Sequence, residues 1–76
     1  MGTRKTYHVT ADGDDWRVKA EGAQRASGVR ENKADAVDLA RELAKNQDQG
    51  QVVVHRADGR IQTEYTYGKD PYPPKG

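Results

Sequence analysis

The sequence predicts a single small α+β domain in which one helix packs on one face of a four-stranded, mostly antiparallel sheet. Two pairs of β-prone segments, each joined by a turn that contains Asp and Gly, flank a middle stretch rich in Ala and Leu. The middle stretch repeats apolar residues every three or four positions, as an amphipathic helix does. The expected element order is therefore ββαββ, and a helix over a sheet is the simplest two-layer arrangement that buries both apolar faces.

Residues 6–10 and 16–20 are predicted to form the first hairpin. The second of these segments alternates apolar with charged side chains, which is the period of a half-buried strand. Between them, residues 12–15 read Asp-Gly-Asp-Asp, and these residue types favour a tight turn. The next segment, 21–31, shows no clear period, although residues 25–30 could add a short edge strand.

The helix is predicted from Lys33 to about Gln47. Asn32 precedes it as the expected N-cap, and Asp35 places a carboxylate in the first turn, near the positive end of the helix dipole. Gly50 is the expected stop signal. Charged residues lie mainly outside the apolar stripe, which consists of Ala36, Val37, Ala40, Leu43 and Ala44.

The second hairpin is predicted from residues 51–56 and 60–67. They are joined across Ala57-Asp58-Gly59, and Asp-Gly between two β-prone runs is a strong hairpin signal.

A Pro-rich tail is expected to follow the compact domain. Its prolines exclude a regular helix or a central strand. We therefore expect residues 1–68 to form the domain, with 1–5 flexible, and residues 69–76 to form an extended tail. Extended Pro-rich segments bind grooves lined by aromatic side chains, so one hypothesis is a partner contact through Pro71, Tyr72, Pro73 and Pro74. The other is that Pro71 and Tyr72 fold back over the domain's own core.

Length and composition limit the classes of protein that this chain can represent. A 76-residue chain with 33% hydrophobic residues forms one domain with a thin core, so a homodimer that buries more surface stays open. The absence of cysteine excludes disulfides and thiolate metal sites, which agrees with a cytoplasmic location. No segment approaches the roughly 20 apolar residues of a membrane span, and no membrane partner is expected.

Strand alternation predicts which side chains point away from the helix. With Trp16 and Val18 on the helix side, Arg17 and Lys19 lie on the other face. The same rule, applied to every strand, gives a candidate binding face of His8, Arg17, Lys19, His55 and Arg60. On the last strand it places Ile61, Thr63, Tyr65 and Tyr67 toward the helix, and Gln62, Glu64 and Thr66 outward.

This face leaves three hypotheses open. Lys and Arg on an open sheet face can contact nucleic-acid phosphates, although the net charge of the chain is only +1. The same face could instead be a dimer surface centred on Val53, or an ordinary solvated face. A metal would need the ring nitrogens of His8 and His55 to converge with a carboxylate such as Glu64, and no metal or other cofactor is expected.

The sequence offers no catalytic motif, and we expect no enzyme activity. The only serine, Ser27, has no base or motif beside it. The carboxylates at 12, 14 and 15 lack the spacing of a calcium loop and fit a turn better. The glycines are scattered and form no phosphate-binding loop.

Several short motifs together resemble the bacterial family called domain of unknown function 2188. They are Tyr7-His8-Val9, Trp16 with Val18, Gly22 to Ser27, Ala40-Arg41-Glu42-Leu43-Ala44, Val53-Val54-His55, Asp58-Gly59-Arg60-Ile61 and Tyr67-Gly68-Lys69-Asp70-Pro71. The resemblance implies a small prokaryotic or phage-borne protein with a compact sheet and one helix. It implies no activity, cofactor or partner, and it assigns no functional residue.

Taken together, these observations predict a non-enzymatic binding module that acts through the open sheet face or the Pro-rich tail. The alternative is a nucleic-acid-associated protein that uses Arg17, Lys19 and Arg60 with the N-terminal Arg4 and Lys5.

Overall fold

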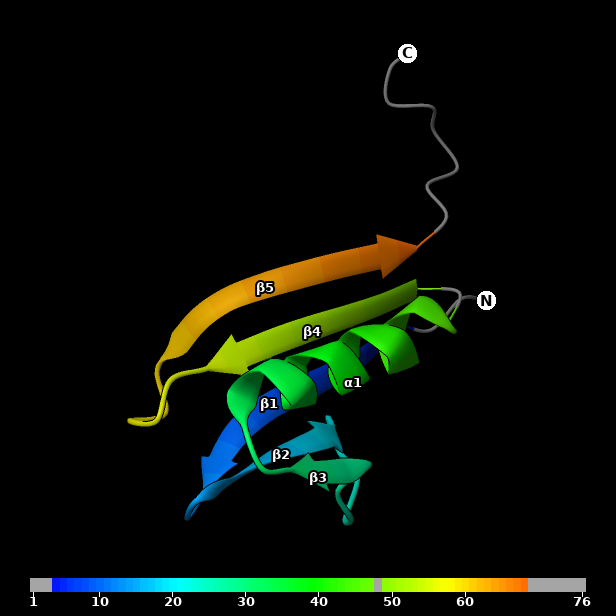
Figure 1. Cartoon of the computed structure of the whole chain (residues 1–76). Coiled ribbons are helices and arrows are strands. Elements are labelled where there is room, and N and C mark those ends of the chain that lie inside the picture. The colour runs from blue at the N-terminus through cyan, green and yellow to red at the C-terminus, as the bar shows by residue number, and fades with distance from the viewer. Residues whose placement is uncertain (1–3, 48, 69–76) are drawn as a thin grey trace.

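The computed structural model describes residues 4–47 and 49–68, which form one helix packed on one face of a single sheet (Figure 1). This confirms the α+β class, but the sheet has five strands and not four. The predicted tail lies outside the described residues. The elements are β1 (Arg4–Asp12), β2 (Asp15–Ala20), β3 (Gly28–Arg30), α1 (Lys33–Lys45), β4 (Gln49–His55) and β5 (Ile61–Gly68).

The sheet is mixed, with strand order β3-β2-β1-β4-β5. Both hairpins, β1–β2 and β4–β5, are antiparallel as predicted, and β3 is the short edge strand that the segment before the helix could add. The central pair, β1 and β4, is parallel. The helix therefore connects β3 to a strand that runs in the same direction, and parallel strands need such a crossover.

Local sequence signals predict both ends of the helix to within two residues. Asn32 caps its N-terminus, because the Asn32 side-chain oxygen accepts a hydrogen bond from the Asp35 backbone N–H at 2.9 Å. The helix ends at Lys45 with Asn46 as C-cap, two residues before the predicted end. Gly50 is not the stop signal, since it lies inside β4. Within the described part of the chain, no helix is long and apolar enough to cross a membrane.

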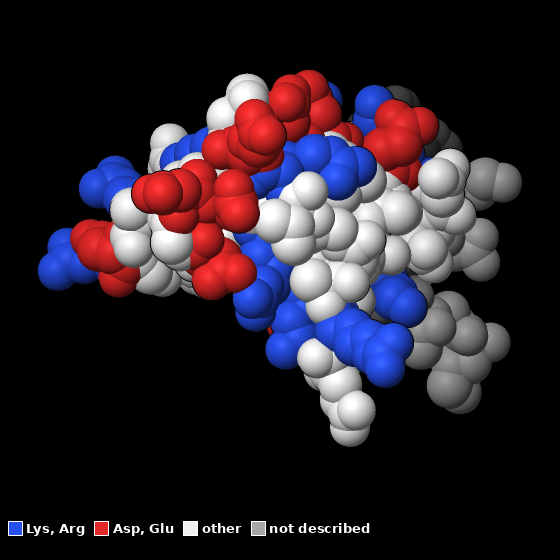
Figure 2. Space-filling model, turned by 60° about the horizontal axis from the view of Figure 1, so that its bottom comes forward, with Lys and Arg blue, Asp and Glu red and all other residues white. Residues whose placement is uncertain are grey.

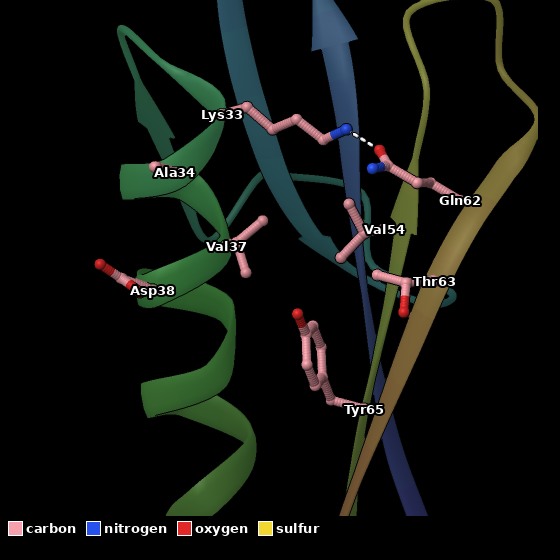
Figure 3. Close-up of a pocket in the computed structure, with 8 residues that line it drawn as sticks. All are labelled: Lys33, Ala34, Val37, Asp38, Val54, Gln62, Thr63 and Tyr65. Atoms are coloured by element: carbon pink, nitrogen blue, oxygen red, sulfur yellow. Dashed lines mark hydrogen bonds between the residues drawn. The ribbon is translucent and has the colours of Figure 1, made fainter.

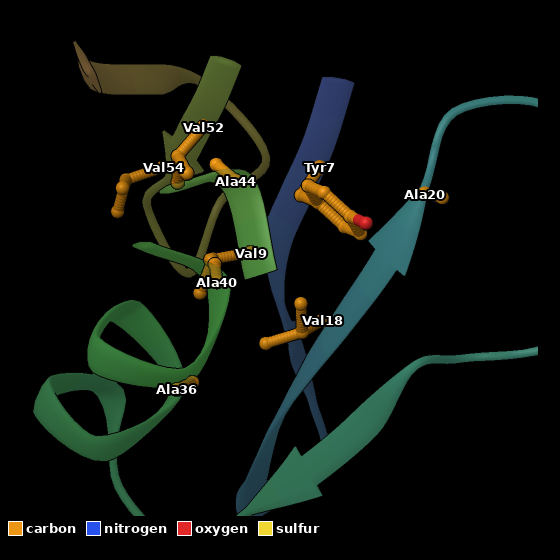
Figure 4. Close-up of a cluster of buried hydrophobic side chains, with 9 residues drawn as sticks. All are labelled: Tyr7, Val9, Val18, Ala20, Ala36, Ala40, Ala44, Val52 and Val54. Carbon is orange, nitrogen blue, oxygen red and sulfur yellow. The ribbon is translucent and has the colours of Figure 1, made fainter. Parts of the chain in front are cut away.

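Alanine lets the helix lie close to the sheet. Ala36, Ala40 and Ala44 are spaced four residues apart and have no exposed surface. Figure 4 shows them next to the buried valines of the sheet, which belong to β1, β2 and β4. The buried cluster consists of Tyr7, Val9, Val18, Ala20, Ala36, Ala40, Ala44, Val52 and Val54.

A β-bulge changes which way the start of β5 faces. The register pairs Val54 with Thr63 but His55 with Ile61, which leaves Gln62 as the extra residue. Ile61 is 56% exposed, and Gln62 accepts a hydrogen bond from the Lys33 ammonium group of the helix. The predicted orientations of Ile61 and Gln62 are therefore wrong. Thr63, Tyr65 and Tyr67 are half-buried on the helix side, as predicted.

Candidate functional site

The sheet face opposite the helix brings two predicted site residues together. His8 on β1 lies opposite Lys19 on β2 and opposite Val53 on β4, and residues paired in this way project from the same face. His55 follows Val53 by two residues and so lies on the same face. The helix covers the other face of the sheet (Figure 1), so it does not bury the side chains of His8 and His55.

The two histidines belong to a chain of side-chain hydrogen bonds. His8 Nδ1 lies 3.0 Å from His55 Nε2, and the ring centroids are 5.2 Å apart. The other nitrogen of His8, Nε2, lies 2.9 Å from a carboxylate oxygen of Glu21. The other nitrogen of His55, Nδ1, lies 3.0 Å from the backbone carbonyl oxygen of Gly59. All four ring nitrogens of the pair therefore have a partner.

The acceptors at the two ends of this chain determine where its protons lie. The Gly59 carbonyl only accepts, so His55 Nδ1 carries a proton and donates. His8 Nε2 donates to the Glu21 carboxylate, and the hydrogen bond between the rings holds one further proton, on His8 Nδ1 or on His55 Nε2. This arrangement places three protons on the four ring nitrogens, and the His8 end of the chain lies 2.9 Å from the Glu21 carboxylate.

A shallow hollow opens beside His8. It has a volume of about 230 Å³. Its polar side chains come from two neighbouring strands and from the turn that follows β2. The lining residues are His8, Thr10, Lys19, Ala20, Glu21 and Gly22.

Two of the basic residues predicted on this face, Arg17 and Arg60, lie next to carboxylates. Arg17 forms an ion pair with Asp12 at 2.6 Å, and both side chains are about half exposed. Arg60 precedes the first residue of β5 and lies 3.8 Å from Asp58 in the hairpin turn. Figure 2, which turns the lower edge of the Figure 1 view forward, shows that acidic and basic side chains both occur on that side of the domain as well. The five predicted residues therefore do not form one continuous positive surface.

Val53 points to the open face as predicted, but it is not an exposed apolar residue. Only 6% of it is accessible. It lies between His8 on the neighbouring strand and His55 on its own strand, and the rings of these two residues contact each other at hydrogen-bond distance. The histidine pair thus shields Val53, which makes it an unsuitable centre for a dimer surface.

The family of the chain follows from comparison with known proteins. Residues 7–67 match the family described as an uncharacterised protein conserved in bacteria, DUF2188. The chain belongs to this family. It is 39% identical over 64 residues to the uncharacterised protein YdaT of Bacillus subtilis (strain 168), an alignment that covers 84% of this chain and 42% of YdaT. The chain thus spans less than half the length of this relative. No solved structure matches it.

In this DUF2188 domain the acidic partner of the histidines is Glu21, which the sequence argument did not include. Glu64 was the expected carboxylate, but it accepts a hydrogen bond from Gln51 at 3.1 Å. Glu21 follows Lys19 by two residues, so strand alternation alone places it on the same face. Its backbone N–H still donates to the Thr6 carbonyl at 2.7 Å, which continues the β1–β2 pairing for one more residue.

A groove on the opposite side of the domain separates α1 from β5. It has a volume of about 460 Å³, and Val37, Val54 and Tyr65 line its apolar part. Figure 3 shows Lys33 reaching across one end toward Gln62, and Tyr65 pointing at the helix. This groove was not predicted, because its two walls come from segments whose contact depends on the tertiary fold.

Basic side chains of the helix cover the tyrosines of β5. The Arg41 guanidinium lies 5.0 Å from the ring centre of Tyr65, and the Lys45 ammonium lies 5.8 Å from that of Tyr67. The Tyr67 hydroxyl accepts a hydrogen bond from Arg41 Nε at 2.6 Å and raises the pKa of the Arg41 guanidinium above its ordinary value. These aromatic rings are therefore already in contact with cations of the domain itself.

Proposed function

We propose that this domain is a non-enzymatic interaction module that binds its partner through the open sheet face around His8. One observation carries the proposal: a hydrogen-bonded chain of Glu21, His8 and His55 lies beside a hollow on a face that the helix leaves uncovered. Fixed polar groups in a shallow hollow provide directional contacts for a ligand. A cytoplasmic location forms part of this proposal.

The polar groups of this face are held in place before any partner arrives. His8 is fixed at both ring nitrogens, and its side chain is still 30% exposed. A partner that contacts it does not have to order a mobile side chain, which lowers the entropic cost of binding. The tail, the other predicted contact, lies outside the described residues and remains a second route to a partner.

Photo-crosslinking in bacterial cells that produce the protein tests the proposal. We expect a photoreactive amino acid at Lys19 or Thr10, which line the hollow, to give one defined crosslinked species. The same amino acid at Glu42, an exposed position of the helix, is the matched control and should not give this species. The change His8→Gln, combined with the label at Lys19, should reduce the yield at least tenfold. Equal yields from positions 19 and 42, or no effect of His8→Gln, would contradict the proposal.

Nucleic acid is the alternative partner for this face. Lys19 lies opposite His8, and Arg17 lies on the same face two residues earlier, so two cations follow one strand. Such cations bind phosphates, and the affinity falls as salt rises. The ion pair of Arg17 with Asp12 weakens this hypothesis, because that charge is already neutralised.

An amide chemical-shift titration with short single-stranded and duplex DNA and RNA tests this alternative. A nucleic-acid binder should show salt-sensitive shifts on the predicted face, and Arg17→Glu with Lys19→Glu should lower its affinity at least tenfold. Arg25→Glu with Lys45→Glu changes the net charge equally elsewhere and is the control. The absence of shifts at low salt would exclude nucleic acid as the partner.

A further inference from the structure

We propose that His8 and His55 form a two-histidine binding site for a divalent transition-metal ion, which replaces the proton shared between their rings. This inference rests on the proposed role of the open face, and it adds the class of ligand that the face takes. The chain supplies two nitrogen ligands. Among the described residues no group of three His, Cys, Asp or Glu side chains could hold a metal, so other ligands complete the coordination.

The distance between the two facing nitrogens suits a shared metal. They lie 3.0 Å apart in the structure. Two nitrogens bound at about 2.0 Å to one ion are about 2.8 Å apart at a right angle and about 3.3 Å apart at the tetrahedral angle. The rings must turn so that both nitrogens point at one ion, and this terminal torsion of histidine has a broad energy minimum.

The outer nitrogens of both rings already have the partners that metal-binding histidines use. A histidine ligand usually donates its other N–H to a carboxylate or a backbone carbonyl, which fixes the ring and its tautomer. His8 donates to the Glu21 carboxylate, and His55 donates to the Gly59 carbonyl. The Gly59 carbonyl is itself held by the hairpin turn, in which the Gly59 N–H donates to the Arg56 carbonyl at 2.8 Å.

The proton balance of binding follows from the hydrogen-bond chain. Without metal, one proton lies between His8 Nδ1 and His55 Nε2, while His8 Nε2 and His55 Nδ1 keep the protons that they donate outward. The ion takes the lone pairs of His8 Nδ1 and His55 Nε2, so one proton leaves for each ion bound. The ion then occupies the place of the shared proton between the two rings, next to the hydrogen bond of His8 with Glu21.

The site is accessible and leaves room for further ligands. The His8 side chain is 30% exposed, and the hollow beside it has a volume of about 230 Å³. Water, or an imidazole or carboxylate of a partner, can occupy the remaining positions of the ion. Imidazole nitrogens suit zinc, copper and nickel ions, and we choose zinc as the probe because it has no redox chemistry.

Isothermal titration of the full chain with Zn²⁺ at neutral pH tests the inference. We expect one ion per chain and the release of one proton, which is measured by repeating the titration in buffers of different ionisation enthalpy. His8→Gln and His55→Gln should each weaken binding at least tenfold. Glu21→Gln should weaken it roughly tenfold, since an outer partner of a histidine ligand contributes that much. Glu64→Gln, on the same face with its carboxylate bonded to Gln51, is the control and should bind as the native chain does.

Nitrogen chemical shifts of the histidine rings give a second readout that needs no variant. Zn²⁺ should shift His8 Nδ1 and His55 Nε2 strongly and leave the two outer nitrogens protonated. Unchanged ring shifts, or equal affinity of the native chain and the folded His8→Gln and His55→Gln variants, would overturn the inference. Neither result would affect the proposed partner binding, because crosslinking from Lys19 reports on the partner and not on the ion.

Discussion

Gly50→Ala is expected to destabilise the domain by about 3 kcal/mol, which is a large part of the 4–11 kcal/mol typical of a chain this long. Gly50 lies in β4 directly below the last turn of the helix. A Cβ atom at this position would overlap the backbone carbonyl oxygen of Ala44 and lie 2.8 Å from its Cα. Backbone atoms of a packed helix cannot turn aside, so the helix end must lift from the sheet and open the contact of Ala44 with the core.

Gly28→Ala is the matched control for this change. A Cβ at position 28 would overlap only the end of the Leu39 side chain, at 2.5 Å, and would lie at an ordinary contact distance of 3.5 Å from the Arg30 guanidinium; both flexible groups can move. Both glycines have ordinary negative φ angles. Both substitutions therefore lower the conformational entropy of the unfolded chain by the same amount, and this contribution to stability is equal in the two variants. Denaturant unfolding should therefore give a cost of about 1 kcal/mol or less for Gly28→Ala. Equal costs for the two variants would show that the helix end is free to move.

Features set by neighbouring residues along the chain could be predicted from the sequence. The cap at Asn32 depends on a contact with Asp35 three residues later, and the turn at Gly59 depends on the Asp-Gly dipeptide before β5. The helix stripe follows from the spacing of its alanines, of which the three at positions 36, 40 and 44 have no exposed surface. Each of these signals lies within a few residues, so tertiary contacts do not override it.

Features that depend on how distant segments meet could not be predicted. Hairpin signals fix the direction of two strands relative to each other, but no signal in the sequence fixes the second hairpin relative to the first. The parallel pairing of β1 with β4 is therefore new information, and it is this pairing that brings His8 beside His55. The sequence argument placed both histidines on the open face, and only the strand order shows that they touch.

The bulge before His55 had the largest effect on the predicted orientations. Alternation along β5 placed Ile61 in the core, because it assumed an unbroken pairing with β4. One extra residue, Gln62, reverses the side on which Ile61 lies, and the alternation beyond Thr63 is unaffected. Glu21 was not predicted as a residue of the open face, for the opposite reason. The alternation continues one residue past the end of β2, but Gly22 directly after Glu21 is typical of a loop.

Val53→Ser is expected to cost about 2 kcal/mol of stability, and Ile61→Ser less than about 1 kcal/mol. Strand alternation read from the sequence predicts the opposite order, since it places Val53 on the outer face and Ile61 in the core. In the structure Val53 is 6% exposed below the histidine pair, and Ile61 is 56% exposed at the start of an edge strand. Serine is the suitable replacement because a carboxylate at position 53 would pair with the neighbouring histidines and hide the loss of burial.

Denaturant unfolding of the two variants, with the histidine ring shifts recorded in the folded state, measures both effects. Val53 lies opposite His8 and two residues before His55 on the same face, so removing its side chain should disturb the hydrogen bond between the rings and move the ring shifts. The Ile61 side chain lies opposite His55 across the bulge, and its loss should leave the contact of His55 with the Gly59 carbonyl in place. A larger cost for Ile61→Ser than for Val53→Ser would mean that the bulge is absent in solution.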